Sequence, residues 1–291
     1  MCLGESDLRE CDVARTPLDA YLDPPVSRAR GTRENARKER TEAMSITTQE
    51  ELDGIVAVSQ IARDVLAELT AHVRPGQTTA ALDRRCGELL AACGAVSAPK
   101  THYGAPCHAF YSVNDIVVHG LPNQRPLADG DVVSIDVTPE YRGFVADTAR
   151  TVVVGEVTAG GVGERLIQAC RAALASALAV VRSGVPVRRV GAAIERTVTA
   201  AGFHVVREFC GHGLGRTIHE EPTIPNFQVK SQRDVLSDGM VIAIEPMITA
   251  IRPQTREASD GWSIAVGRGN VAAHLEHTMI VTRDQPLLLT A

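Results

Sequence analysis

Four acidic residues recur in similar surroundings, each beside aliphatic residues typical of β-strands. The segments 129–136 and 238–245 both begin with an Asp-Gly turn dipeptide, continue through an aliphatic run and end in a carboxylate. The next predicted strands also end alike, at the two further acids Asp147 and Glu276. A buried carboxylate is costly unless it is paired or bound to a metal ion, and several together repel one another. Most of the four have no Lys or Arg beside them, so two divalent cations would neutralise their charge. The sequence therefore predicts a metal centre with the ligands Asp136, Asp147, Glu245 and Glu276.

An imidazole is expected to complete this centre. His212 lies between glycines in the segment Cys210–Gly215, where small residues let the backbone approach closely. A phosphate-binding loop is the competing interpretation, but no Lys-Ser/Thr pair follows and the spacing is not G-x-G-x-x-G. Oxygen ligands favour Mg, Ca or Mn, and an imidazole shifts the preference towards Fe, Co, Ni or Zn. His119 ends a predicted strand, and His219 begins a segment whose two prolines predict a loop. Taken alone, each histidine fits a structural role better than a catalytic one, just as a single acid in a strand is usually a solvated edge residue.

The elements that position these residues occur twice in the chain. Thr48 begins a capping-box motif, and amphipathic helices are predicted from residue 48 and over about 79–92. The glycine turns that end these helices recur 108 residues later, at 184 and 202, and the acid-ended segments recur at an offset of 109. This repetition predicts two α+β half-domains, related by a pseudo-twofold axis and sharing one core.

Composition excludes several classes of protein. The chain has 291 residues, 30 Lys and Arg against 35 Asp and Glu, and only 3% aromatic residues, which argues against a nucleic-acid-binding protein. Seven cysteines without a C-x-x-C pair argue against a zinc knuckle or a disulfide framework and suit a reducing cytosol. No uninterrupted apolar stretch is long enough to span a membrane. We expect a cytoplasmic protein, with a monomer as the default.

The first 43 residues differ from the rest. They contain prolines and a mixed-charge run without apolar periodicity, so residues 1–43 are predicted to be a flexible N-terminal extension that precedes a domain over 44–291. An equally open alternative is that Met44 is the true start of the protein.

Together the motifs resemble the type I methionine aminopeptidases over about residues 46–290. His212 and Glu245 are only some 33 positions apart, too few for the long insertion of the type II enzymes. The resemblance implies a pita-bread fold, in which two pseudo-symmetric halves with an antiparallel sheet flanked by helices surround a dinuclear metal site. It rests on Asp136, the Asp147-Thr148 pair, Cys210–Gly215, His219–Pro222, Ile244–Met247 and Leu275–Thr278.

The resemblance also implies an activity, the removal of the N-terminal (initiator) methionine from nascent proteins by a hydroxide that bridges two divalent ions, which could be Co, Mn, Fe or Zn. Glu245 would shuttle the proton, His219 would stabilise the carbonyl oxygen and His119 would contact the substrate's amino end. Trp262 and Phe110 would lie at the side-chain pocket. The implied ligands are Asp147 and Glu276 bridging both ions, Asp136 on the second ion, and His212 and Glu245 on the first.

The sequence departs from the family's pattern at several positions around the pocket. Phe110 stands where the family usually has a small thiol, and Ala105 stands where it usually has an aromatic residue. The volume of Phe110 would fill the space lost at Ala105. These changes put the preference for methionine in question. We interpret His274 as a hydrogen-bonded histidine beside the metal ligands; the alternative is that His274 is an extra metal ligand. The unusual positions are His102, Ala105, Phe110, Ile218 and His274.

Two alternative functions remain at this point. An Xaa-Pro dipeptidase shares the metal-binding fold, although those chains usually carry a long separate N-terminal domain. A non-catalytic binding protein on the same fold is less favoured because all five expected ligands are present. The ribosome is a further candidate partner of the extension, since the substrates would be nascent chains.

Overall fold

The structure is a computed structural model that describes residues 44–156 and 160–291; the predicted extension, residues 1–43, lies outside the described residues. In these ranges the helices are α1 (Gln49–Ala71), α2 (Thr79–Ala92), α3 (Ala98–Tyr103), α4 (Val162–Leu178) and α5 (Val187–Ala200). The strands of the first half are β1 (Val96–Ser97), β2 (Phe110–Val113), β3 (Ile116–Val118), β4 (Val132–Val137), β5 (Pro139–Tyr141), β6 (Phe144–Val145) and β7 (Thr148–Val153). Those of the second half are β8 (His204–Val205), β9 (Cys210–Gly213), β10 (Glu220–Pro225), β11 (Val241–Ile244), β12 (Met247–Thr249), β13 (Arg256–Glu257), β14 (Ile264–Ala265), β15 (Ala272–His274), β16 (Glu276–Ile280) and β17 (Leu287–Leu288).

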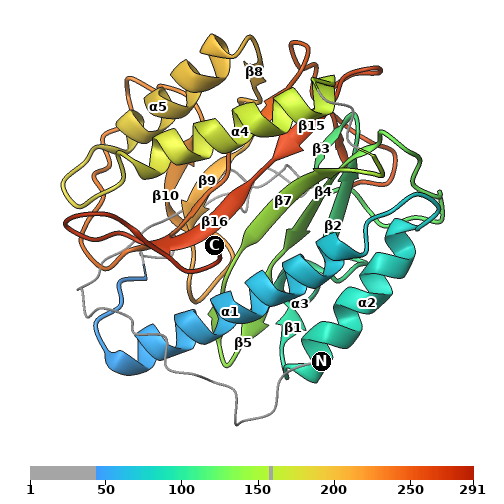
Figure 1. The fold of residues 1–291 in the computed structure, drawn as a ribbon. Coiled ribbons are helices and arrows are strands. Elements are labelled where there is room, and N and C mark those ends of the chain that lie inside the picture. The colour runs from blue at the N-terminus through green and yellow to red at the C-terminus, as the bar shows by residue number, and fades with distance from the viewer. Residues whose placement is uncertain (1–43, 157–159) are drawn as a thin grey trace, which may run out of the picture.

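The central sheet is arranged symmetrically about its middle. Its strands follow the order β10-β9-β11-β16-β7-β4-β2, with β17 also paired to β16, and β16 and β7 are antiparallel neighbours. Around this central pair β11 corresponds to β4 and β9 to β2. Figure 1 shows α1 and α2 along one half of the sheet and α4 and α5 along the other. The predicted pair of α+β half-domains is confirmed.

The turns repeat to the level of single hydrogen bonds. The Gly76 N–H donates to the Leu127 carbonyl over 2.8 Å, and the Gly184 N–H donates to the Leu236 carbonyl over 2.8 Å. Both glycines have positive φ angles, 81° and 84°, in a region that residues with a Cβ atom rarely adopt. The same turn chemistry therefore ends α1 in one half and α4 in the other.

The helix boundaries agree closely with the sequence prediction. The Thr48 side chain accepts from the Glu51 N–H while the Glu51 carboxylate accepts from the Thr48 N–H, so the capping box at the start of α1 is confirmed. Helix α2 covers 79–92 and is capped by Thr78, whose hydroxyl accepts from the Ala81 N–H. The buried side chains of α1 follow helical spacing and are Ile55, Val58, Ser59, Ala62, Val65, Leu66 and Leu69.

Packing of the helices on the sheet determines which side chains are left for the site. Val133, Ile135 and Val137 of β4 belong to one core cluster with α1 and α2. Because successive side chains of a strand point to opposite faces, Asp136 is turned away from this core. In the second half α4 and α5 pack on β11 and β16. The helices thus cover one face, and the predicted acid of β4 lies on the other.

Two local predictions were wrong. Asp147 and Glu276 lie at the beginnings of strands, one residue before β7 and at the first residue of β16, and not at strand ends. The segment after His219 is strand β10, whereas its prolines predicted a loop. β10 is the edge strand of the sheet, where a residue without an N–H is tolerated because only one side of the strand is paired.

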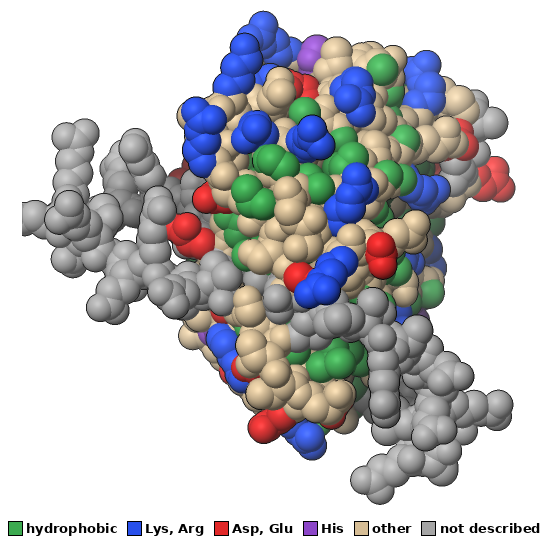
Figure 2. All heavy atoms as spheres, turned by 90° about the vertical axis from the view of Figure 1, so that its left-hand side faces the viewer, with side chains coloured by type: hydrophobic (Ala, Val, Ile, Leu, Met, Phe, Trp, Pro, Cys, Tyr) green, Lys and Arg blue, Asp and Glu red, His purple; other side chains and the backbone are tan. Residues whose placement is uncertain are grey.

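The outer surfaces of the two halves differ in charge. Helix α1 carries the acids Glu50, Glu51, Asp53, Asp64 and Glu68 with the single base Arg63, whereas α5 carries Arg188, Arg189 and Arg196 with the single acid Glu195. Figure 2 shows Lys and Arg side chains gathered on the upper part of the face on the α5 side. Among the described residues, no helix combines the length and apolar character needed to cross a membrane.

Candidate metal centre and substrate pocket

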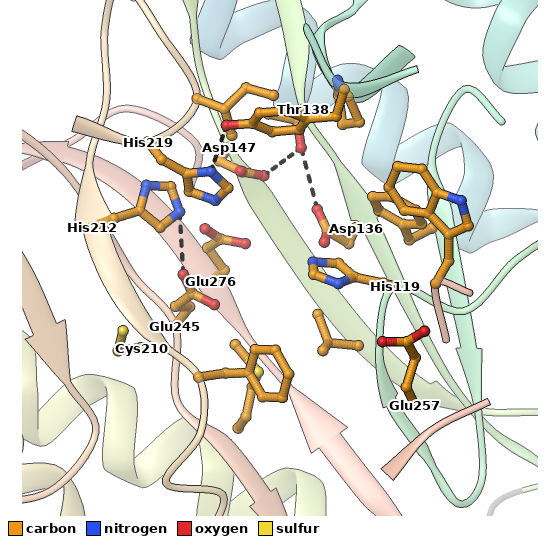
Figure 3. A pocket seen from close by; sticks show the side chains of 18 of the residues that line it. His119, Asp136, Thr138, Asp147, Cys210, His212, His219, Glu245, Glu257 and Glu276 are labelled. Atoms are coloured by element: carbon orange, nitrogen blue, oxygen red, sulfur yellow. Dashed lines mark hydrogen bonds and ion pairs between the residues drawn. The ribbon is translucent and has the colours of Figure 1, made fainter. Parts of the chain in front are cut away.

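One cavity, enclosing about 290 Å³, brings the predicted site residues together on the face of the sheet opposite α1, α2, α4 and α5. Figure 3 shows His212, His219, Asp147, Glu245 and Glu276 on one side of it and Asp136 and His119 on the other. The predicted residues that line it are Phe110, His119, Asp136, Asp147, His212, Ile218, His219, Glu245, Trp262 and Glu276.

The four acids reach the cavity from the two central strand pairs. Asp136 lies in β4, and Glu245 follows the last residue of β11. Ala149 of β7 pairs with Asp136 on one side and with Glu276 of β16 on the other, which brings these two acids near each other across the centre of the sheet. Carboxylates from the two halves therefore meet near the pseudo-twofold axis.

Short contacts link the imidazole to the carboxylates. His212 Nε2 lies 3.2 Å from Glu245 Oε1. One ligand atom each from Asp147, His212 and Glu276 lies within 4.8 Å of the other two, as the donors of one ion would. His212 Nδ1 lies 2.9 Å from the Gly213 carbonyl oxygen, so a neutral ring that donates from Nδ1 would present the lone pair of Nε2 to a metal ion.

Thr138 connects the remaining acid to this group. Its hydroxyl lies 2.9 Å from Asp147 Oδ1 and 3.5 Å from Asp136 Oδ1. Figure 3 shows this hydroxyl between the two carboxylates. Asp136 is thus placed beside Asp147, at the edge of the cluster away from His212.

Burial and mutual repulsion make the cluster costly without a cation. Burial raises the pKa of Asp147 and of Glu276 well above the usual range for carboxyls, and the neighbouring carboxylates raise both further. Burial also raises the pKa of Asp136. Burial acts in the same direction on Glu245, but the imidazoles of His212 and His274 more than offset it and its pKa is lowered. Within the described part of the chain, no Lys or Arg contributes to these shifts.

These residues fit divalent metal ions. Carboxylate oxygens with one imidazole form a donor set typical of Mn, Fe, Co and Zn sites. Among the residues that the structure describes, Glu276 Oε1 is buried without a hydrogen-bond partner. A bound cation would give this oxygen a partner and would neutralise the repelling charges. The cluster is therefore a candidate metal centre.

Two further histidines lie at the cavity wall. His119 follows β3 with a φ angle of 57°, and burial lowers its pKa to about 4. Burial also lowers the pKa of His219 well below its usual range, and the neighbouring His212 lowers it further. The rings of His212 and His219 meet edge to face with centroids 4.5 Å apart. Both wall histidines are therefore neutral around neutral pH and can donate one N–H each.

The apolar side of the cavity is built around Phe110. Its ring lies 5.0 Å from the His119 ring and 5.9 Å from the Trp262 ring, centroid to centroid. Trp262 is held by a turn in which Asp260 Oδ1 accepts from the Trp262 N–H over 2.9 Å. Ala105 belongs to the same apolar cluster, so Phe110 does fill space beside this small residue.

The other unusual positions have separate surroundings. Ile218 is buried against Ala98 at the base of α3. His102 points away from the cavity and pairs with Glu140, Nε2 to Oε2 over 2.9 Å. His274 departs from the expected hydrogen-bonded histidine, because its buried Nε2 lies 3.5 Å from Glu245 Oε2 and 3.6 Å from a Glu276 oxygen without forming a hydrogen bond to either.

Several cavity residues were not identified from the sequence. Tyr103 lies at the end of α3 and contacts His219, and Thr138 joins two of the acids. The position of Thr138 directly after the strand that carries Asp136 was a usable signal, whereas the contact of Tyr103 spans 116 residues of sequence and gave none. The others lining the cavity are Pro99, Val118, Phe209, Met247, Glu257 and Gly261.

Comparison with known families identifies the fold and the chemistry class. The family model of metallopeptidase family M24 matches residues 53–283. The chain belongs to metallopeptidase family M24. It is 39% identical over 250 residues to the methionine aminopeptidase of Escherichia coli K12, covering 85% of this chain and 94% of that protein. It is 36% identical over 248 residues to methionine aminopeptidase 1A of Arabidopsis thaliana, covering 85% of this chain and 62% of the relative.

Solved structures agree with this assignment. The methionine aminopeptidase of Rickettsia prowazekii superimposes with a TM-score of 0.81 at 34% identity, covering 85% of this chain and all of that one (100%). An Xaa-Pro dipeptidase from Bacillus anthracis superimposes with a TM-score of 0.66 at 20% identity, covering 84% of this chain and 61% of that one. The second likeness shows the fold alone. The pita-bread fold of this metallopeptidase family is therefore confirmed.

Proposed function

We propose that this chain is a metal-dependent aminopeptidase that removes the N-terminal methionine from nascent proteins and peptides. The observation that carries the proposal is the cluster of four carboxylates and His212 beside an apolar pocket wall, in a chain 39% identical to a methionine aminopeptidase. The dipeptidase alternative has only the shared fold in its favour.

The metal centre would hold two divalent ions. Asp147 and Glu276, which lie at matched strand starts near the axis, would help to hold both. Of the other three ligands, His212 and Glu245 from the second half would hold one ion and Asp136 from the first half would hold the other. When bound, such ions lower the pKa of water towards neutrality and polarise a carbonyl group.

The remaining steps belong to side chains of this protein. Glu245 would accept a proton from the attacking water and pass it to the nitrogen of the leaving amine. His219 would donate an N–H to the oxygen of the scissile carbonyl, where negative charge develops. His119, on the opposite wall of the cavity, would contact the amino end of the substrate and hold the scissile bond in register with Glu245.

The apolar wall would receive the first side chain of the substrate. Phe110, Ala105 and Trp262 present hydrocarbon surface next to His119, which suits an unbranched apolar side chain such as that of methionine. An apolar pocket discriminates by only about 1–3 kcal/mol per methylene. The preference for methionine over its isosteres is therefore set by the volume that Phe110 leaves open.

Hydrolysis of Met-Ala-Ser by metal-free protein reconstituted with Mn, Fe, Co or Zn in turn tests the proposal. We expect release of free methionine with at least one ion, binding of about two ions per chain, and no cleavage of the N-acetylated peptide. Asp147→Asn is the matched control for metal-dependent turnover. Absence of cleavage with every ion, or preferential cleavage of an Xaa-Pro dipeptide, would contradict the proposal.

A further inference from the structure

Tyr103 contacts His219 at Nδ1 of its imidazole ring. Its hydroxyl lies 2.7 Å from His219 Nδ1, and the two rings are stacked with centroids 5.6 Å apart and planes inclined by 22°. Tyr103 itself lines the cavity and is 44% exposed. A hydrogen bond of this length to one ring nitrogen determines what the other nitrogen can do, because a neutral imidazole carries a single N–H.

Helix α3 is anchored so that Tyr103 meets His219. At its start, Ala98 is fully buried against Val145 and Ile218, the residue that directly precedes His219. At its end, Gly104 adopts a φ angle of 72°, and its N–H donates to the Pro99 carbonyl, which closes the helix. One apolar cluster thus fixes the base of the helix to the segment that carries the histidine.

Helix α3 is also tied to β5, a strand of the small sheet β1-β5-β6. The neighbouring His102 pairs with Glu140 of β5, and the Thr101 hydroxyl also reaches the same carboxylate, at 3.4 Å. With its flanking residue held on Glu140, the Tyr103 ring has a defined position over His219. The packing of α3 therefore fixes the contact between the Tyr103 and His219 rings.

The direction of the hydrogen bond follows from what surrounds His219. Either the phenol O–H donates to Nδ1, or Nδ1–H donates to the phenol oxygen. In the second arrangement Nε2 would present a lone pair towards the developing oxyanion. In the first arrangement Nε2 presents an N–H, the group that stabilises an oxyanion. The contact of His219 with Tyr103 is at Nδ1, and His219 lines the cavity that would hold the substrate.

We infer that Tyr103 is a positioning residue that donates its hydroxyl hydrogen to His219 Nδ1 and thereby keeps the proton of His219 on Nε2, aimed at the scissile carbonyl oxygen. This inference rests on the proposed function, which supplies the oxyanion that Nε2–H would contact. The tautomer itself can be measured in the resting protein.

Tyr103→Phe tests the inference, because it keeps the stacked ring and removes only the hydroxyl. We expect kcat for Met-Ala-Ser to fall about tenfold, the effect of losing one hydrogen bond that selects the tautomer, with KM changed by less than about twofold. The matched control is Tyr141→Phe, which removes a phenol hydroxyl from β5 and is expected to leave both constants unchanged. Thermal melting verifies that both variants are folded.

A double-mutant cycle separates positioning from a general structural effect. In the His219→Ala background, Tyr103→Phe should cause no further loss of kcat, because the hydroxyl acts only through the imidazole. An additional tenfold loss in that background would overturn the inference. So would an unchanged kcat for Tyr103→Phe in an enzyme that cleaves Met-Ala-Ser.

Nitrogen NMR of the whole protein labelled with 15N-histidine reads the tautomer without any assay of activity. In the unmodified chain, Nδ1 of His219 should show the shift of an unprotonated nitrogen and Nε2 that of a protonated one, and Tyr103→Phe should move both towards averaged values. A proton on Nδ1 in the unmodified chain would overturn the inference. If the protein cleaves no peptide but shows the expected tautomer, the proposed function has failed and the positioning of His219 by Tyr103 stands.

Discussion

Strands β2 and β9 occupy the same place in the two halves of the sheet but carry different chemistry. His212 of β9 pairs with Ala243, and Ser112 of β2 pairs with Ser134, where Ala243 and Ser134 are themselves matched across the repeat. The position that holds an imidazole in the second half therefore holds a hydroxyl in the first. The acids obey the pseudo-twofold symmetry, whereas the imidazole breaks it.

The serine has a different task in its own half. Its hydroxyl accepts from the Gly120 N–H over 3.2 Å and so supports the turn that presents His119. Gly120 has no alternative here, because a Cβ atom would lie 2.4 Å from the Tyr111 carbonyl oxygen. One half thus supplies the imidazole of the metal centre, and the other supplies a histidine for the substrate. Duplication accounts for the scaffold and the acids, and divergence between the halves accounts for the two kinds of histidine.

We expect the largest effect when the residues at the two matched positions are replaced by alanine, one in each variant. His212→Ala removes a ligand and should lower kcat for Met-Ala-Ser by on the order of 10³-fold, with loss of stoichiometric metal. Ser112→Ala removes one hydrogen bond and should change kcat/KM by no more than about fivefold. Similar losses in the two variants would show that the halves are not divided in this way.

Removing one carboxylate charge near the pseudo-twofold axis should stabilise the metal-free protein. The pKa of Glu276 is raised on folding, so the stability linked to its proton is present below its unfolded pKa, about 4.3, and is lost as pH rises through the folded value. Glu276→Gln should therefore raise the melting temperature of metal-free protein at neutral pH by a few degrees and flatten its fall with increasing pH. Calorimetry between pH 4 and 8 measures this.

The same variant should respond less to metal. Added Mn or Co should stabilise the unmodified chain more than Glu276→Gln, because the variant lacks one ligand. Glu88→Gln, on the exposed face of α2, is the control and should change neither the pH dependence nor the metal response. A Glu276→Gln variant that melts at or below the unmodified temperature at neutral pH would exclude charge repulsion as the cost of the cluster.

A third variant makes the two halves alike at the pocket. Phe110 and Cys210 are the first residues of β2 and β9, and both line the cavity. Phe110→Cys should widen the pocket and change the ratio of kcat/KM between Met-Ala-Ser and Leu-Ala-Ser by about tenfold. Val113→Ala, at the other end of β2, is the control for altered packing. An unchanged ratio would mean that Phe110 does not limit the pocket.

The sequence was most informative where one short pattern determines one local structure. The capping box at Thr48 and the span of α2 were predicted correctly because their hydrogen bonds join residues close in sequence. The glycine turns were predicted correctly because each depends on the positive φ angle of a single glycine. The repeat then located the acids, since two matched patterns constrain the pairing of the halves. This is why the residues of the candidate metal centre could be named before their positions were known.

Long-range and edge effects escaped the same reasoning. The prolines after His219 indicated a loop, but pairing with β9 on one side only lets β10 form despite them. The hydroxyl of Tyr103 meets His219 only because Ala98 and Ile218 pack together across more than a hundred residues of chain. Neither feature leaves a periodic signal, because each depends on which elements become neighbours in the folded chain.

The smallest expected effect concerns the helices that begin after the matched turns. Helix α2 is capped by the Thr78 hydroxyl, which accepts from the Ala81 N–H over 3.1 Å, whereas α5 begins after Pro186 without a side-chain cap. Thr78→Ala should lower the free energy of unfolding by about 1 kcal/mol, because it leaves a helix N–H without its partner, and kcat should stay unchanged. Pro186→Ala removes no such bond, so any loss should come only from the greater freedom of the unfolded chain and stay below that of Thr78→Ala. Urea unfolding of both variants measures the difference, and an equal loss would show that the cap contributes nothing beyond the backbone of the turn.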